Sequence, residues 1–330
     1  MKKALVTKIL ASFLCGILGY GFVFGQAWGQ TTTYPVRPIK IFVGFAPGGA
    51  PDLIARIVGQ KLSEKLGQPI IVENRAGATG NIAAQIVSKS ESDGYSLLLA
   101  TVSLAINSTM TEMNAVNPEK DLEPVGMVAS VPLILVSSPK LPVTTIEGLI
   151  ELARTKPGTL NYASVGNGSP QQLTAELFQI MAGIKMTHIP YKGGGPATQA
   201  VLANEVDLFF AGMPPALPFV KSKQLNGLAV TSSKRSIAAP EIPTMQERGL
   251  QNFEADNWNA LFAPKGTPKE IITLVNSELN KVLQLPEVKS KFESQGAEAW
   301  PSSISDTKGY LSKEISKWTK VVKTPGVKTE

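Results

Sequence analysis

Three glycine-rich segments hold the residues of this 330-residue chain whose types and spacing best suit the binding of a small anion. The segments are FAPGGAPD (45–52), SVGNGSPQQ (164–172) and YKGGGPATQ (191–199). Glycine allows a tight turn or the close approach of a ligand, and each segment contains a proline suited to the first turn of a helix. Backbone N–H groups and the positive end of a helix dipole then favour a carboxylate or a phosphate.

The sequence contains few of the motifs that catalysis or cofactor binding would require. His188 is the one histidine, so a histidine metal cluster is excluded and a Ser–His–acid triad would have to use it. We expect His188 to be a packing or strand-edge residue, and Asp52 to cap its helix and order the Pro-Gly-Gly loop rather than act as a general base. Neither GxSxG nor GxxxxGK[ST] is present, and GNG at 166–168 lacks a third glycine. We therefore predict no enzyme, no cofactor and no metal.

The first 29 residues have the pattern of a secretory signal. Three lysines precede an apolar stretch at 9–24, and small residues follow near Ala27 and Gly29, either of which suits cleavage. A membrane anchor or a lipoprotein at Cys15 is the alternative, disfavoured by the short, glycine-broken stretch and by Leu14. Removal of this segment takes away the one cysteine and lowers the net charge from +6 to about +3. A chain without thiols suits the periplasm, and diffuse basicity gives no case for nucleic acid.

Strand and helix patterns alternate after Tyr34 and must position the glycine-rich segments. The predicted strands are IKIFVGF, PIIVENR, YSLLLAT, LILVSS, LNYASV, HIPYK, VDLFFAG, LNGLAVTS and NALFAP. The predicted helices cover 52–66, 80–88, 146–155, 171–181, 197–204, 269–283 and 304–322. Alternation of β-branched strands with amphipathic helices predicts an α/β fold with parallel sheets covered on both faces, and the last helix, with Trp318, should pack on the first lobe.

Two stretches mark places where the chain changes lobe. EKDLEPVGMVASVPLILVSSP leaves the first set of strands and helices, and NFEADNWNALFAPKGTPKE returns to it. We therefore predict a discontinuous first lobe, 31–130 plus 257–330, and an inserted second lobe, 131–256. Two such lobes facing each other could close around a small anion bound at the carboxyl ends of their strands.

Several motifs together resemble a known family. They are YPVRPIKIFVGFAPGGAPDLIAR, PIIVENRAGATGNIAA, DGYSLLLAT, LNYASVGNGSPQQLTAELF, HIPYKGGGPA, LAVTSSKRS, PEIPTMQERGL and NALFAPKGTPKE. In this order, from about residue 34 to 322, they resemble the Bug family of periplasmic substrate-binding receptors of tripartite tricarboxylate transporters.

The resemblance implies a type II periplasmic-binding-protein fold, in which two α/β lobes joined by a two-segment hinge close like a Venus flytrap. It implies a monomer that captures an organic carboxylate or dicarboxylate and delivers it to a permease of one large and one small integral membrane subunit. The alternative function is a sensor that, once loaded, signals to a two-component membrane kinase. The sequence does not separate the two, since both use the same closed form.

The resemblance also implies a cradle of loop amides around the carboxylate. Its ligand-binding residues would be Phe45, Pro47, Gly48, Gly49, Asp52, Thr101, Ser103, Ser164, Gly168, Ser169, Lys192, Gly193, Gly194 and Ala211. Thr101 and Ser103 belong to a loop, 101–107, expected at the same mouth. Lys192 has two interpretations, a partner for the ligand carboxylate or a solvated strand-end lysine, and we favour the second.

Three positions depart from the family pattern towards smaller or neutral groups. Ala200, the pair Ala211 and Gly212, and Gln172 stand where many members have Asp, Asp-Asn and His. If these positions face the site, it is roomier and less negative, which predicts an aromatic or extended dicarboxylate. The predicted apolar wall consists of Phe45, Phe253, Met213 and Trp258. The alternative explanation is that these positions lie on the surface and that their residues changed by neutral sequence drift.

Overall fold

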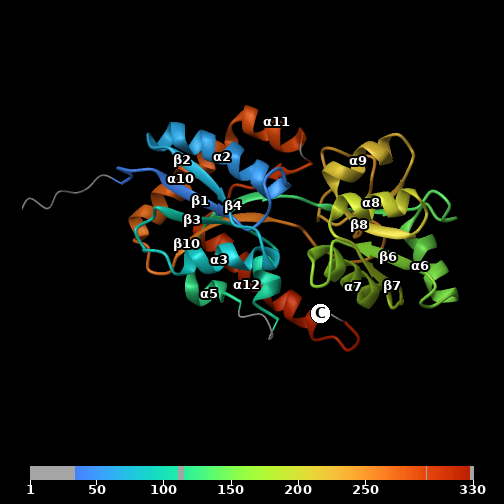
Figure 1. Cartoon of the computed structure of the whole chain (residues 1–330). Helices are drawn as coiled ribbons and strands as arrows, with labels where there is room; N and C mark the ends of the chain where they lie inside the picture. Colours follow the sequence, from blue (N-terminus) through green and yellow to red (C-terminus); the bar gives the residue numbers. More distant parts are fainter. Residues whose placement is uncertain (1–33, 111–114, 295, 328–330) are drawn as a thin grey trace, which may run out of the picture. The chain divides into compact units, whose positions relative to one another are not determined.

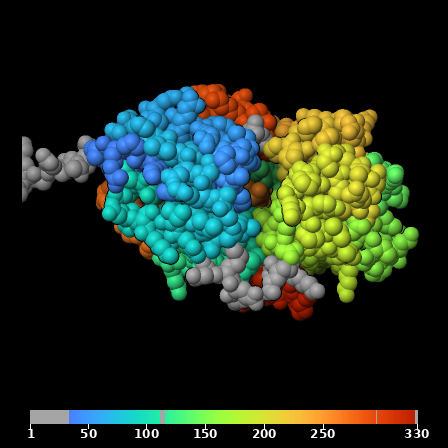
Figure 2. All heavy atoms as spheres, in the orientation of Figure 1, coloured from blue at the N-terminus to red at the C-terminus, as the bar shows by residue number. Residues whose placement is uncertain are grey.

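The structure, a computed structural model, describes residues 34–110, 115–294 and 296–327. The predicted signal segment, 1–29, lies outside the described residues. Within the unit Pro35–Glu330, the described residues build two sheets, each flanked by helices (Figure 1). In Figure 2, the visible face of the first lobe consists mainly of early blue-to-cyan segments, and the second lobe of green-to-yellow segments from the middle of the chain.

The first lobe contains a six-stranded sheet in the order β11-β4-β10-β3-β1-β2. Its strands are β1 (Ile39–Val43), β2 (Ile70–Asn74), β3 (Ser96–Thr101), β4 (Leu122–Ser130), β10 (Asn259–Pro264) and β11 (Glu298–Ala299). β1 lies between β2 and β3 and is parallel to both, so the carboxyl ends of these three strands share one edge. β10 runs antiparallel to β3 and β4 and brings the C-terminal part of the chain into this sheet.

Helices of the first lobe place apolar residues at helical spacing on the sheet. They are α2 (Ala50–Leu66), η1 (Ala78–Gly80), α3 (Asn81–Ser88), α4 (Ser103–Asn107), α5 (Pro118–Asp121), α10 (Lys269–Gln284), α11 (Pro286–Ser294) and α12 (Ile304–Val322). In α10, Ile272, Val275 and Leu279 recur every three or four residues and are buried. This single apolar face explains why α10 packs against β4 and α2 while its other faces remain polar.

The second lobe contains a five-stranded sheet in the order β7-β6-β8-β5-β9. Its strands are β5 (Leu133–Ser137), β6 (Asn161–Ser164), β7 (Thr187–Pro190), β8 (Leu208–Gly212) and β9 (Asn226–Val230), and its helices are α6 (Ile146–Thr155), α7 (Pro170–Ala182), α8 (Gly194–Leu202) and α9 (Met213–Lys221). β6 is parallel to β7 and β8, whereas β5 is antiparallel to β8 and β9.

Two chain segments connect the sheets and lie side by side. Pro132, between β4 and β5, forms an antiparallel bridge with Asp256, just before β10. The Asp256 carboxylate accepts the N–H of Val131 at 3.1 Å, and the Thr231 hydroxyl accepts the N–H of Leu133 at 2.9 Å. These bonds tie the outgoing and returning segments together, as a two-segment hinge requires.

All nine predicted strands and all seven predicted helices are confirmed, but the prediction of parallel sheets is wrong in part. Both sheets are mixed, because β4 and β10 in the first and β5 in the second run antiparallel to neighbours. The Pro-punctuated exit from the first lobe is itself the nine-residue strand β4. Pro124 argued against a strand here, yet it is buried and lies opposite Phe262, at an irregularity in the ladder where no regular N–H bond is needed.

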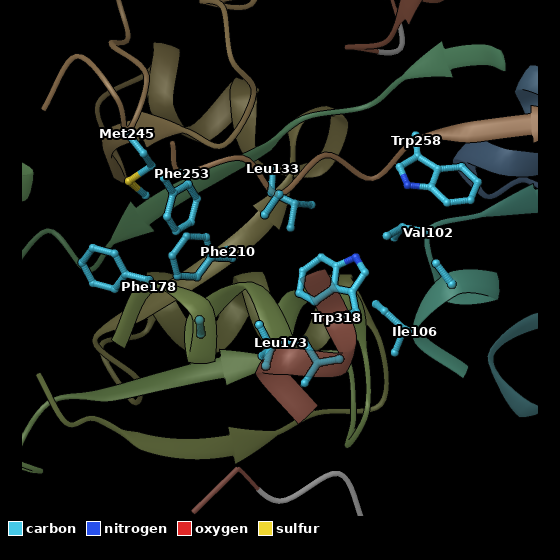
Figure 3. Close-up of a cluster of buried hydrophobic side chains, with 14 of the residues drawn as sticks. Val102, Ile106, Leu133, Leu173, Phe178, Phe210, Met245, Phe253, Trp258 and Trp318 are labelled. Atoms are coloured by element: carbon cyan, nitrogen blue, oxygen red, sulfur yellow. The ribbon is translucent and has the colours of Figure 1, made fainter. Parts of the chain in front are cut away.

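Buried aromatic side chains fill the interior (Figure 3). Phe178 of α7 packs edge-on against Phe210 of β8, with ring centroids 5.9 Å apart, and Phe253 lies next to Phe210. The indoles of Trp258 and Trp318 each donate to the buried carboxylate of Glu314 at 3.0 Å. α12, which carries Trp318, packs on α4 and β4 as expected, and it also contacts α7 of the second lobe. Among the described residues, no helix has the length and apolar character needed to cross a membrane.

The predicted apolar wall of the site is wrong for three of its four members. Phe253 and Met213 are fully buried and Trp258 is 1% exposed, all within hydrophobic clusters. Ala200 and Ala211 are also buried in the cluster between the second sheet and α8 and α9. Their small size therefore reflects packing, and the argument for a roomier site has no structural basis at these two positions.

Candidate functional site

The first glycine-rich loop joins β1 to α2 and is held by one carboxylate. Asp52, 2% exposed, accepts the N–H of Gly48 at 2.9 Å. The amide of Asn74, at the end of β2, donates to Asp52 Oδ1 at 2.9 Å and to the carbonyl oxygen of Phe45 at 3.0 Å. Arg56, one helical turn along α2, forms an ion pair with Asp52 at 3.0 Å. The prediction that Asp52 orders this loop is confirmed, whereas the prediction that it caps the helix is wrong, because the N-cap of α2 is Gly49 and no side chain caps it.

The charge state of Asp52 follows from these contacts. Burial by itself would raise the pKa of its carboxyl group, but hydrogen bonds from Arg56, Gly48 and Asn74 outweigh burial and hold the pKa below its usual value. The carboxylate is therefore ionised at neutral pH, and its charge is balanced within the lobe by Arg56. The loop can accept an anion without that anion meeting an uncompensated negative charge.

A second turn beside this loop was missed by the sequence interpretation. Four consecutive residues, from Gly77 to Gly80, have positive φ angles, including Ala78 at 46° and Thr79 at 50°. Such a run is rare outside glycine, and Asn107 stabilises it by bonding the Thr79 hydroxyl at 2.9 Å. The signal in the sequence was the string GATG directly after a predicted strand, which resembles the three segments that were recognised.

The two turns touch each other at the edge of the first sheet. A side chain at Gly44 would come within 2.4 Å of the Gly80 backbone, and one at Gly80 would come within 3.4 Å of the Phe45 ring. Phe45, Thr79 and Asn107 line a small crevice here, together with Thr101 at the end of β3. The ends of β1, β2 and β3 thus bring their loops together, as expected for a ligand-binding edge of an open sheet.

The second-lobe loop repeats the arrangement of the first. Gly168 donates its N–H to Gln172 Oε1 at 2.7 Å, again from four residues earlier in the chain. The hydroxyl of Ser169 caps α7 by accepting the N–H of Gln172 at 3.4 Å. Gln172 is 1% exposed, and its side-chain oxygen braces the loop from within.

A hydroxyl and an imidazole support this loop from inside. Ser164, the last residue of β6, lies 2.6 Å from His188 Nε2 through its Oγ, and it bonds both the N–H and the carbonyl oxygen of Gly166 at 3.1 Å. His188 stacks on Tyr162, with ring centroids 5.0 Å apart. Burial lowers the pKa of His188, which keeps the ring neutral at neutral pH.

The third glycine-rich segment follows β7 and is tied to the second. Tyr191 donates its N–H to the Ser164 carbonyl oxygen at 3.0 Å. Gly193 precedes α8 with φ 113°, a conformation that favours glycine. Lys192 is exposed to solvent, in keeping with the interpretation as a strand-end lysine.

The fourteen predicted site residues divide into two sets. Those at least partly exposed are Phe45, Pro47, Gly48, Gly49, Lys192, Gly193 and Gly194. Those buried are Asp52, Thr101, Ser103, Ser164, Gly168, Ser169 and Ala211. The first set offers exposed surface to a ligand, and Thr101 of the second set lines the crevice beside Phe45. Hydrogen bonds that hold the loops involve Asp52, Ser164, Gly168 and Ser169. Ala211 stands apart, because its methyl group packs in the hydrophobic cluster of the second lobe.

This arrangement suits reversible binding of an anion. The loops at both sheets offer backbone groups and few charged side chains, so an anion would be held mainly by neutral donors. Residues 45–49 and 192–194 are glycines, Phe45, Ala46 and Pro47, with Lys192 as their one ionisable side chain. Loops of this composition can bind an anion through their backbone groups.

Comparison with known proteins assigns the chain to a family. The family model described as "Tripartite tricarboxylate transporter family receptor" matches residues 54–327. Protein BugT of Bordetella pertussis is 41% identical over 298 residues, which are 90% of this chain and 91% of BugT. These relationships agree with the resemblance found in the motifs.

Two solved structures share the fold and identify the class of protein. The R. palustris protein Rpa4515, determined with adipate, has a TM-score of 0.78 at 34% identity over 89% of this chain and 99% of that chain. MatC of Rhodopseudomonas palustris, determined with malate, has a TM-score of 0.74 at 28% identity over 88% of this chain and 100% of that chain. The chain has the two-lobe α/β architecture of periplasmic binding proteins, and it belongs to the Bug family of tripartite tricarboxylate transporter receptors.

Proposed function

We propose that the protein captures an aliphatic dicarboxylate in the periplasm and delivers it, unchanged, to a membrane permease of one large and one small subunit. The observation that carries this proposal is the pair of braced glycine loops, Gly48 with Asp52 and Gly168 with Gln172. Membership of the receptor family supports the role in transport. The predicted signal segment, 1–29, supports export.

The choice of an aliphatic dicarboxylate follows from two observations. The similar proteins Rpa4515 and MatC were determined with adipate and malate, both aliphatic dicarboxylates. The aromatic alternative depended on an apolar wall, and three of its four side chains are buried in hydrophobic clusters. Phe45 is the one half-buried member, and a single ring edge does not favour an aromatic ligand over an aliphatic chain.

Capture would use the two lobes as the halves of one site. In our proposal the first lobe is 31–130 plus 257–330, and the second lobe is 131–256. The paired segments at Val131 and Asp256 would serve as the hinge between them. Neutral amide donors bind a carboxylate through many moderate bonds, which allows release to the permease without a change in charge.

Calorimetry on the purified mature chain tests this proposal. Adipate and malate should bind with measurable heat and raise the melting temperature, by an amount equivalent to about 2.7 kcal/mol at a ligand concentration 100 times Kd. A monocarboxylate of similar length and a phthalate serve as comparison ligands, and both should bind more weakly. Absence of heat and of a thermal shift with every dicarboxylate would contradict the proposal.

Delivery needs a separate measurement. Proteoliposomes that contain both permease subunits should accumulate labelled dicarboxylate only when the loaded receptor is present. Binding without any receptor-dependent uptake would reject the transport role and favour the sensor alternative.

A further inference from the structure

His188 occupies an unusual position for the one histidine of the sequence. It lies on β7, the edge strand of the second sheet, directly opposite Tyr162 of β6. One edge of its ring faces Ser164 Oγ at 2.6 Å. It also lines a groove of about 660 Å³, which contains Glu176 and Lys185. The ring thus connects a solvent-accessible groove with the inner side of the loop that follows β6.

The plane of the ring is fixed from one side. Tyr162 stacks on His188 with an interplanar angle of 23°, and the Tyr162 hydroxyl donates to Glu176 Oε1 at 2.6 Å. Glu176 is held in turn by the side-chain amide of Gln179 at 3.0 Å. α7 therefore holds Tyr162, and Tyr162 keeps the imidazole in the plane that directs Nε2 at Ser164.

The hydrogen-bond donors and acceptors around Ser164 Oγ determine which tautomer of His188 fits. A serine hydroxyl has one proton to donate and can accept two hydrogen bonds. Ser164 is fully buried, so its partners must be protein groups, and those within reach are His188 Nε2 and the N–H and carbonyl oxygen of Gly166. All three are satisfied together only if His188 Nε2–H and Gly166 N–H donate to Oγ while the hydroxyl donates to the Gly166 carbonyl oxygen.

The opposite tautomer would break one of these hydrogen bonds. If Nε2 accepted the proton of Ser164, the Gly166 carbonyl oxygen would lose its bond to the hydroxyl and would keep only the longer bond from the N–H of Ser169, at 3.3 Å. Gly166 has φ 129°, a conformation that favours glycine, and its peptide group determines how the following N–H groups of the loop are oriented. The tautomer of His188 therefore acts on loop 165–168 through Ser164.

We propose that His188 is a positioning residue for ligand capture: its Nε2–H donates to Ser164, which fixes the Gly166 peptide group and so shapes the second-lobe loop that receives the anion. This proposal rests on the proposed function, since it assigns the shape of that loop to ligand binding. It assigns no contact between His188 and the ligand.

The single histidine permits a direct spectroscopic test on the wild-type protein. Nitrogen-15 NMR of histidine-labelled protein at pH 7.5 should show the Nε2–H tautomer, because the chemical shifts of Nε2 and Nδ1 separate the two neutral forms. An Nδ1–H tautomer overturns the inference, whether or not a ligand binds.

Variants test the effect on binding, with adipate as the probe in calorimetry. His188→Leu, which removes the donor, should weaken binding about three- to tenfold, whereas His188→Gln retains an N–H at a similar place and should stay within about twofold. Ser164→Ala should weaken binding as much as His188→Leu, and the double variant should be no worse than either single variant. Melting temperatures of all variants show whether each is folded.

The outcomes separate this inference from the proposed function. A wild-type protein that binds no dicarboxylate overturns the proposed function and the positioning role with it. A wild-type protein that binds adipate, with His188→Leu unchanged or with the two single effects adding in the double variant, overturns the positioning role alone.

Discussion

Gly168 donates its backbone N–H to Gln172 Oε1 at 2.7 Å, across a span of four residues. In the other lobe, Gly48 donates to Asp52 across the same span at 2.9 Å. Each loop follows a strand, contains a left-handed glycine and is braced by a side chain from the first turn of the helix that follows. The two halves of the molecule therefore present loops of the same construction with different charge on the brace.

Removal of the Gln172 amide should destabilise the second lobe. Gln172→Leu leaves the buried N–H of Gly168 without its acceptor, and urea denaturation should show a loss of about 1–3 kcal/mol. The neighbouring Gln171 is a matched control, because its buried Oε1 has no hydrogen-bond partner. Gln171→Leu should be neutral or stabilising, and equal losses in the two variants would show that the Gly168 bond contributes nothing specific.

Replacement of Asp52 should affect both stability and its dependence on pH. Asp52→Ala removes the acceptor for Gly48 and Asn74, so we expect a loss of about 1–3 kcal/mol at pH 7 and weaker adipate binding. Because the pKa of Asp52 is lowered in the folded protein, its contribution is present above the unfolded value near 3.8 and is lost as pH falls through the folded value. Wild type and variant should therefore converge in stability below about pH 3.8, and a constant difference from pH 7 to pH 3 would count against the role of the ionised carboxylate.

Titration of Asp256, at the paired connecting segments, should make the protein less stable at pH 8 than at pH 5. Burial, with repulsion from Glu254 and Glu314, raises its pKa to about 7, so its stabilising protonated form is lost as pH rises through 7. The hydroxyl of Tyr310 also lies near Asp256. Lys317, which forms an ion pair with Glu314, supplies the positive charge in this region.

Asp256→Asn tests this, since Asn retains an oxygen for the N–H of Val131 and cannot ionise. Between pH 5 and pH 8, wild type should lose on the order of 2–3 kcal/mol more than Asp256→Asn in urea denaturation. The exposed Glu241→Gln serves as a control for a simple change in net charge. Parallel curves for wild type and Asp256→Asn would refute the titration of Asp256 in this range.

The loop after β1 and the turn from Gly77 to Gly80 can touch only because Gly44 has no side chain. Gly44→Ala would place Cβ 2.4 Å from the Cα of Gly80, so the turns must separate, and we expect a loss of about 1–3 kcal/mol and weaker binding of adipate. Gly309 in α12 has no atoms near an added Cβ, so Gly309→Ala should stabilise the protein by about 0.5–1 kcal/mol. Similar effects of the two substitutions on stability would contradict the close approach at Gly44.

The sequence predicted regular elements well, because their periodicity is local. In strands such as β8 and helices such as α10, the spacing of apolar residues is enough to identify the element, and the glycine-rich loops lie between such elements. Antiparallel pairing of β10 with β3 and β4 was not predictable, since strand direction depends on the route of the chain between distant segments.

Prediction of the site was limited for a related reason. A sequence motif indicates which residues belong to a loop but not which of their side chains face outward. Phe253 and Trp258 are polar-flanked aromatics in the sequence, yet they lie in the core, and the brace formed by Gln172 depends on a side-chain geometry that no pattern reports. The turn from Gly77 to Gly80 was missed because Ala78 and Thr79 separate its two glycines.

A crystal structure of the mature protein grown with adipate tests the central claim most directly. We predict one carboxylate of adipate within hydrogen-bond distance of backbone N–H groups in loop 45–50, loop 165–168 or loop 192–195, with the Gly48–Asp52 and Gly168–Gln172 bonds retained. Adipate bound elsewhere, or these loops closed off by their own side chains at saturating adipate, would contradict it.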